Sequence, residues 1–129
     1  MLVADASVLA PAIADGGPDG SRYRQRLRGE TLAGPESARV EVLSVLRRQL
    51  NHATLTTQQA DAAVADLVAL PISVYPTVGL ITRCWELRDN VTPYDAIYVA
   101  LAESLGCTLL TADRRLASAP GPTCTIEVL

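Results

Sequence analysis

The sequence contains no lysine, and all 11 of its basic residues are arginine. This absence excludes a phosphate-binding loop of the GK[ST] type and chemistry through a Schiff base, and it argues against a receiver domain. There is also a single histidine, His52, so a Ser-His-Asp set has one candidate base and no supporting motif. We therefore interpret His52 as a helix-end residue that interacts with free carbonyl groups.

Cysteines and long apolar runs are also scarce. The cysteines Cys84, Cys107 and Cys124 are odd in number and show no CxxC spacing, so they indicate neither a disulfide framework nor a zinc knuckle. No apolar stretch approaches the roughly 18 residues of a membrane span, and the first residues lack the basic region of a signal peptide. We expect a soluble protein of the reducing cytoplasm, with no membrane segment.

Length, charge and composition restrict the function further. The chain of 129 residues with 49% hydrophobic residues predicts one globular domain over residues 1–129. Its formal net charge of −3 argues against electrostatic binding of nucleic acid by the whole surface. A local basic patch remains compatible with this charge.

Short apolar runs alternate with helical patterns along the chain, and this alternation predicts a parallel sheet of about five strands that is covered by helices on both faces. The strands are expected at residues 2–4, 31–34, 72–75, 107–110 and 124–128. Pro35 is expected to begin one helix, and a polar loop at 15–20 is expected to precede an Arg-rich one. Capping signals predict three more helices, which start at the Thr56–Gln59 capping box, at Thr77 and at Thr92-Pro93.

Four acids follow or flank the predicted strands. Asp5 comes directly after the first strand and Asp113 after the fourth. Glu41 lies two turns into the helix after the second strand, and Asp95 lies in the first turn of the buried helix before the fourth. Because ligands of open α/β sheets bind at the carboxyl ends of the strands, we expect the four carboxylates to gather at one edge.

Each acid also has an ordinary structural explanation. Asp5 or Ser7 can accept backbone N–H groups where the chain turns into a helix, Asp95 favours a helix dipole, and Asp113 can cap a helix. Glu41 borders an apolar stripe, which a purely solvated role explains less well. Together, crowded carboxylates repel one another, and a hard divalent cation such as Mg²⁺ or Mn²⁺ resolves that repulsion. Acids without lysine, cysteine or histidine partners point to phosphodiester hydrolysis.

The segments that carry these acids resemble the ordered motifs of PIN domains, specifically the VapC-like toxins of bacterial toxin–antitoxin pairs. They are DASVL, PESARVEVLSVLRR, TPYDAIYVALAESLG and LLTADRRL. The resemblance implies a three-layer α/β/α fold and an Mg²⁺-dependent endoribonuclease, with Mn²⁺ able to substitute and water as the nucleophile. It implies a homodimer and a cognate antitoxin that occupies the active groove. It also assigns the site: Asp5, Glu41, Asp95 and Asp113 as the catalytic, metal-binding acids, with Ser7 and Thr111 as supporting hydroxyl groups.

Other functions stay open at this point. A PIN nuclease of RNA processing or quality control would share the site, and a silent PIN scaffold would only bind. Relatives often carry a further acid where Arg114-Arg115-Leu116 stands here, so the number of metal ions is open. The segment from Arg22 to Arg28 either binds phosphates near the active edge or forms a solvated helix. Tyr94 and Tyr98 either stack on a base or pack, and Trp85 is expected in the core or a dimer contact.

Overall fold

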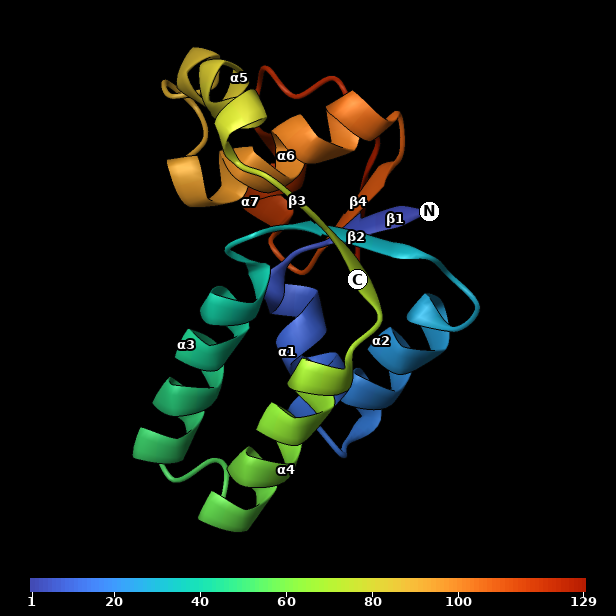
Figure 1. The fold of residues 1–129 in the computed structure, drawn as a ribbon, viewed down its shortest axis with the longest axis vertical. Coiled ribbons are helices and arrows are strands. Elements are labelled where there is room, and N and C mark those ends of the chain that lie inside the picture. The colour runs from blue at the N-terminus through green and yellow to red at the C-terminus, as the bar shows by residue number, and fades with distance from the viewer.

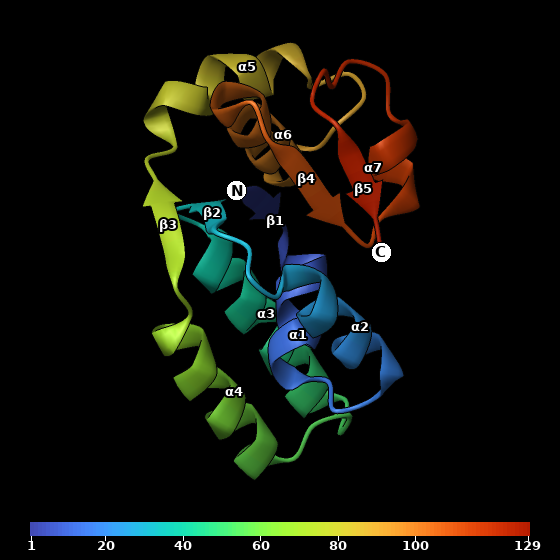
Figure 2. The same ribbon diagram turned by 90° about the vertical axis from the view of Figure 1, so that its right-hand side faces the viewer.

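The computed structural model describes all residues from Met1 to Leu129. Its centre is a five-stranded, all-parallel sheet with the strand order β3-β2-β1-β4-β5 (Figures 1 and 2). The strands are β1 (Leu2–Ala4), β2 (Leu32–Pro35), β3 (Ile72–Tyr75), β4 (Thr108–Thr111) and β5 (Ile126–Val128). The predicted α/β class with five parallel strands is confirmed.

Helices cover both faces of the sheet, which gives three layers (Figure 1). One face carries α1 (Ala6–Ala14), α2 (Pro18–Leu27), α3 (Ala38–Asn51) and α4 (Thr57–Ala69). The other carries the 3-10 helix η1 (Val78–Leu80), α5 (Ile81–Glu86), α6 (Pro93–Leu105) and α7 (Arg114–Ser118). Successive residues of a strand point to opposite faces, so Val3 joins the core beneath α6 while Leu2 and Ala4 join the core beneath α1.

The start of α3 differs from the prediction. Pro35 does not begin the helix but ends β2, where it pairs with Tyr75. Proline has no N–H to give to the sheet, but the next residue supplies the bond, because Glu36 N donates to Tyr75 O at 3.2 Å. The helix starts at Ala38, and Glu41 therefore lies in its first turn rather than two turns inside it.

The Arg-rich helix starts earlier than predicted. The turn before α2 is closed by Asp15, whose carboxylate accepts a hydrogen bond from Gly17 N at 2.7 Å, and Pro18 takes the first helical position. The loop is therefore shorter than residues 15–20. Gly20 lies against this turn, and a Cβ there would come within 2.0 Å of Asp15 O. Only glycine permits this approach of α2 to the end of α1.

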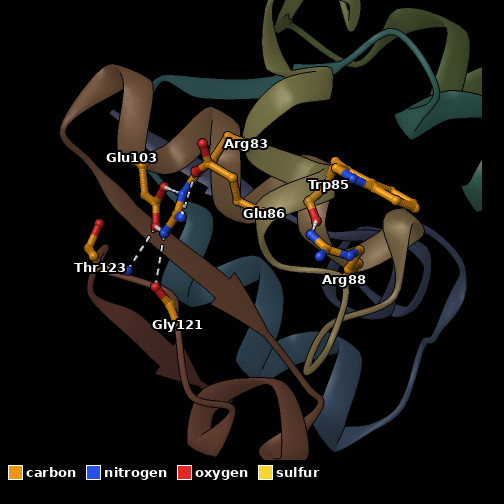
Figure 3. A network of polar contacts seen from close by, with 7 residues as sticks. All are labelled: Arg83, Trp85, Glu86, Arg88, Glu103, Gly121 and Thr123. Atoms are coloured by element: carbon orange, nitrogen blue, oxygen red, sulfur yellow. Dashed lines mark hydrogen bonds and ion pairs between the residues drawn. The ribbon is translucent and has the colours of Figure 1, made fainter.

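The predicted helix from Thr77 to Asn90 is replaced by two shorter elements, η1 and α5. Thr77 does not cap it: its N–H and its hydroxyl both donate to Glu36 Oε2 at 3.3 Å, which ties the segment to β2. Trp85 is 67% exposed, so its assignment to the core is wrong. The Arg88 guanidinium lies 4.8 Å from the centre of the Trp85 ring (Figure 3).

Other local predictions are confirmed. Thr56 Oγ1 accepts from Gln59 N at 3.1 Å and Gln59 Oε1 accepts from Thr56 N at 2.9 Å, which completes the capping box of α4. Thr92 caps α6, and Gly106 ends that helix in the left-handed conformation with φ of 62°. All seven residues from 96 to 102 are buried, as their unbroken apolar character predicts.

All three cysteines are free thiols. The His52 ring nitrogen Nδ1 lies 2.8 Å from Arg48 O at the end of α3, which confirms its helix-end position. None of the helices combines the length and the apolar character that a membrane crossing requires.

Candidate active site

The fold brings the four acids to the edge where the parallel strands end. Asp5 directly follows β1, Asp113 follows β4, and Glu41 and Asp95 lie in the first turns of α3 and α6. Their charges interact: repulsion from Asp95 acts on the pKa of both Asp5 and Glu41, and repulsion from Asp113 acts on that of Asp95. The gathering of carboxylates expected from the strand ends is thus present.

Asp5 both caps a helix and belongs to this acid cluster, which is defined as Asp5, Glu41, Asp95 and Asp113. The side chain of Asp5 is 5% exposed, and its Oδ1 accepts from Ser7 N at 3.0 Å, from Val8 N at 3.3 Å and from the Ser7 hydroxyl. Burial raises the pKa of Asp5, and repulsion from Asp95 adds to this rise. Hydrogen bonds from Ser7, Thr111 and Val8 lower the pKa but do not cancel the rise.

Ser7 and Thr111 join the two turns that carry Asp5 and Asp113. Ser7 Oγ accepts from Ala112 N at 2.8 Å and lies 3.5 Å from Thr111 Oγ1. Thr111 is fully buried, and its hydroxyl accepts from Asp113 N at 3.0 Å. The two hydroxyl groups therefore fix the β1–α1 turn against the β4–α7 turn.

Glu41 is held by a donor on each carboxylate oxygen. Its Oε1 accepts from Ser37 Oγ at 2.8 Å, and its Oε2 accepts from the Tyr98 hydroxyl at 3.0 Å. Burial raises the pKa of Glu41, as does repulsion from Asp95 and Asp5, against the lowering effect of the two donors. Tyr98 is fully buried, which confirms packing rather than base stacking. The sequence alone does not predict the contact between Tyr98 and Glu41. The spacing of three residues between Asp95 and Tyr98 does place these two side chains on one side of α6.

Asp95 and Asp113 each have one carboxylate oxygen without a protein donor. Asp95 Oδ2 accepts a long hydrogen bond of 3.4 Å from the Thr92 hydroxyl. Asp113 Oδ1 caps α7 by accepting from Arg115 N at 2.8 Å, and the Arg115 guanidinium lies 3.6 Å from the same oxygen. Burial raises the pKa of Asp95, and repulsion from Asp113 raises it further. The second oxygens of both aspartates remain available to a ligand.

Two hollows flank the acid cluster. One, of about 280 Å³, is lined by Asp95, Asp113 and Arg115 among others. The other, of about 760 Å³, lies between α1, α3 and α6 and is lined by Ala6, Ser7, Glu41, Ser44, Val45, Arg48 and Tyr94. Glu41 therefore borders one open surface depression, and Asp95 and Asp113 border another, which suits an extended substrate better than an enclosed small molecule.

The donor set suits a hard divalent cation. All four acids offer carboxylate oxygens, which Mg²⁺ and Mn²⁺ prefer, and burial with mutual repulsion raises the pKa of three of them. No three histidine, cysteine, aspartate or glutamate side chains converge closely enough to make a complete ligand set. A cation here would need further oxygens, as Mg²⁺ ordinarily takes from water and from substrate phosphate.

The Arg-rich helix α2 lies elsewhere. It leads into the beginning of β2, so its end is at the edge opposite the acids (Figure 1). Arg24 donates to Ala12 O at 3.1 Å and to Asp15 O at 2.7 Å, and Arg26 makes a bidentate pair with Glu127 at 2.8 and 2.9 Å. Of the two interpretations given for this segment, the engagement of Arg24 and Arg26 with other groups of the protein and the position of the helix end disfavour phosphate binding near the active edge. The basic side chains near the acids are instead Arg48 and Arg115.

Comparison with known proteins agrees with this architecture. Residues 2–122 match the PIN domain family. VapC20 from Mycobacterium tuberculosis, a Sarcin-Ricin loop cleaving toxin, superposes with a TM-score of 0.71 and 16% identity, covering 92% of this chain and 94% of that one. VapBC2 from Rickettsia felis, solved in complex with a DNA fragment from its promoter, superposes with a TM-score of 0.70 and 14% identity. The match covers 98% of this chain and 97% of that one. The chain belongs to the PIN-domain family.

Sequence relatives define its place in that family more narrowly. VapC ribonuclease Mb0985 from Mycobacterium bovis is 39% identical over 129 residues, which is all of this chain and 98% of the relative. Ribonuclease VapC1 from Mycobacterium tuberculosis is 40% identical over 128 residues, which is 98% of this chain and 96% of the relative. Identity at this level over nearly the full length of both chains places this protein among the VapC ribonucleases.

Proposed function

We propose that this protein is a metal-dependent endoribonuclease that acts as the toxin of a toxin–antitoxin pair. The observation that carries the proposal is the acid cluster, four carboxylates from four segments that lie at the carboxyl edge of the sheet and repel one another. Full-length similarity to VapC ribonucleases supports RNA as the substrate and a toxin as the role. The intact acid cluster argues against a silent scaffold, and the toxin relatives favour this role over general RNA processing.

We assign the four acids as the residues that hold Mg²⁺, with Mn²⁺ as a substitute. When bound, such an ion would lower the pKa of a coordinated water and would stabilise the negative charge that develops on the phosphate during hydrolysis. Ser7 and Thr111 keep Asp5 and Asp113 in place, while Ser37 and Tyr98 orient Glu41. Glu41, whose two carboxylate oxygens are held by these donors, is the group we assign to position the attacking water. Hydrolysis breaks one P–O bond of the RNA backbone and adds the elements of that water to the products.

The partner follows from the same charges. A cluster of acids attracts a guanidinium, which can satisfy carboxylates bidentately and displace a metal ion. We therefore propose a cognate antitoxin that presents an arginine to the acid cluster, and a homodimer of this chain as the toxin unit. Among the structural neighbours, a toxin–antitoxin complex from Klebsiella pneumoniae has a TM-score of 0.68 at 18% identity.

The test of this function is cleavage of RNA by the purified protein with Mg²⁺ or Mn²⁺. EDTA should abolish cleavage, and Asp5→Asn or Asp95→Asn should each lower the rate at least about a hundredfold, because a metal-linked transition-state contact is lost. Nuclease contamination is controlled by purifying every variant in parallel. Cleavage at the wild-type rate by either variant would remove these acids from the mechanism.

A further inference from the structure

The larger hollow beside the acid cluster has one wall made by a single face of α3. Ser44 and Val45 lie three and four residues after Glu41, and Arg48 lies four and three residues after them, so the four side chains share that face. Tyr94 and Ser7 complete the lining from α6 and α1. The hollow therefore runs from the acid cluster along α3 and carries a cation and an aromatic ring as well as a carboxylate.

Arg48 is distinguished from most other arginines by having no partner in the protein. The guanidiniums of Arg26 and Arg83 are engaged with glutamates and those of Arg24 and Arg39 with backbone carbonyls, whereas that of Arg48 makes no hydrogen bond or ion pair. Arg48 is exposed and lies seven residues after Glu41, which is about 10 Å along the helix axis. A phosphate bound by Arg48 would therefore be a different phosphate of the RNA backbone from the one that is cleaved at the acid cluster.

Tyr94 supplies a different kind of contact. Its side chain is 75% exposed, although it directly precedes Asp95 and lines the hollow. The backbone at this position is fixed by Pro93 and by the Thr92 cap of α6, so the ring projects from a rigid helix start. An exposed aromatic ring on a rigid support, next to a site for RNA cleavage, is suited to stack on a base.

We infer that this hollow binds a single-stranded segment of RNA beside the scissile phosphate, with Arg48 on a neighbouring phosphate and Tyr94 against an unpaired base. The inference rests on the proposed ribonuclease function and adds to it two residues outside the acid cluster that contact the RNA. A ring can stack on the face of a base only where that base is not already stacked in a helix, so the hollow favours loops and single strands over duplex. Arg48 adds a charge contact that is independent of sequence.

The phosphate contact is tested with two adjacent variants of α3. Arg48→Ala and Arg47→Ala remove the same charge, but Arg47 is exposed, unpaired and outside the hollow. Binding of a fluorescent, unstructured oligoribonucleotide is measured by anisotropy with Ca²⁺, and cleavage of the same RNA with Mg²⁺. We expect Arg48→Ala to weaken binding about tenfold and to reduce the slope of log K against log salt by about 0.7, as the loss of one single-strand phosphate contact predicts. Arg47→Ala should change binding less than about twofold.

The base contact is tested at Tyr94. Tyr94→Ala should weaken binding of the single strand at least about fivefold, as the loss of one stacked base predicts. Tyr94→Phe keeps the ring and should bind the single strand as tightly as wild type does. Binding of a duplex of the same sequence should not respond to either variant. Because Tyr94 is largely exposed, both variants should melt at the wild-type temperature.

The outcomes separate this inference from the proposed function. If wild-type protein cleaves no RNA with Mg²⁺ or Mn²⁺, the proposed function fails. If wild type cleaves RNA but Arg48→Ala behaves as Arg47→Ala does, or Tyr94→Ala behaves as Tyr94→Phe does, the activity stands and the assignment of that residue is overturned.

Discussion

Individual acids of this site have two tasks. The Asp5 carboxylate caps α1 and the Asp113 carboxylate caps α7, yet both also contribute charge to the acid cluster. The cap requires only an oxygen that accepts a hydrogen bond, and asparagine provides one equally well. The charge is therefore in excess of what the fold requires, and substitution by asparagine separates the two tasks.

Asp95→Asn should make the metal-free protein more stable at neutral pH. The pKa of Asp95 is raised by burial and by Asp113, so the folded protein is destabilised when this carboxylate is ionised. Its hydrogen bond to Thr92 is long, at 3.4 Å, and little is lost with it. We expect a higher melting temperature for the variant in EDTA, and a larger stabilisation of wild type than of the variant by Mg²⁺.

The pH dependence of this difference follows from the direction of the shift. A folded-state pKa above the ordinary value of 3.8 means that the destabilisation is full above the raised pKa, decreases as the pH falls below it and is absent below 3.8. The advantage of Asp95→Asn should therefore shrink on acidification in EDTA. A variant that melts below wild type at neutral pH, with an equal Mg²⁺ response, would leave Asp95 an ordinary residue of the helix start.

Tyr98→Phe tests the orientation of Glu41. The variant removes the hydroxyl that donates to Glu41 Oε2 and leaves the ring in the core. Since this hydrogen bond lowers the pKa of Glu41, its loss should raise that pKa and move the acidic limb of the pH–rate profile to higher pH. We expect about a tenfold lower rate at neutral pH and a stability loss of about 1 kcal/mol. An unchanged pH profile would confine Tyr98 to packing.

At the scale of elements, most of the fold could be predicted from local pattern. The strands are recognisable because their apolar runs are short and continuous. Helix α6 is recognisable because its apolar run is bounded by Thr92-Pro93 at the start and by Gly106 at the end. The start of α3 could not be predicted in this way, because proline is as favourable at the start of a helix as at the end of a strand. The pairing of Pro35 with β3 decides between the two. The convergence of the four acids followed from topology, whereas the contact of Tyr98 with Glu41 depends on side-chain packing across 57 residues.

One ion-pair network joins elements that local pattern could not relate. Arg83 of α5 makes a bidentate pair with Glu103 of α6 at 2.7 and 3.1 Å and donates to Gly121 O at 2.9 Å (Figure 3). Glu103 also accepts from Thr123 N at 2.8 Å. Burial would raise the pKa of Glu103, but the hydrogen bonds from Arg83 and Thr123 outweigh it and hold the pKa below its ordinary value.

Arg83→Met should lower the free energy of unfolding by about 1–3 kcal/mol, because a partly buried glutamate loses its charged partner. Arg88→Met is the matched control, since Arg88 donates one hydrogen bond, to Trp85 O, stacks on an exposed ring and makes only a long ion pair of 4.0 Å with the exposed Asp89 (Figure 3). Because the lowered pKa of Glu103 gives stability that is present above 4.5 and lost on acidification, the Arg83 effect should decrease as the pH falls. Equal melting temperatures for the two variants would contradict this role.

At the scale of the whole molecule, the acid cluster defines how a partner protein should bind. Replacing the arginine proposed for the antitoxin should weaken the complex at least about tenfold, because carboxylates of the site would lose a charge-assisted partner. Isothermal titration with wild-type and Asp95→Asn toxin measures both sides of the contact. Equal affinity of the antitoxin for the two toxins would place its contact away from the acids.

The order of the strands also bears on how the enzyme is made. β1 lies at the centre of the sheet, between β2 and β4, although it is synthesised first and β4 follows only after α6. A growing chain therefore carries Asp5 and Glu41 for most of its synthesis, and Asp95 only towards the end, before Asp113 and the Thr111 hydroxyl that lies against Ser7 are added. With the four acids assigned as proposed above, the acid cluster is complete only when the segment after β4 has emerged from the ribosome, so the proposed nuclease site is not assembled while most of its own chain is being translated.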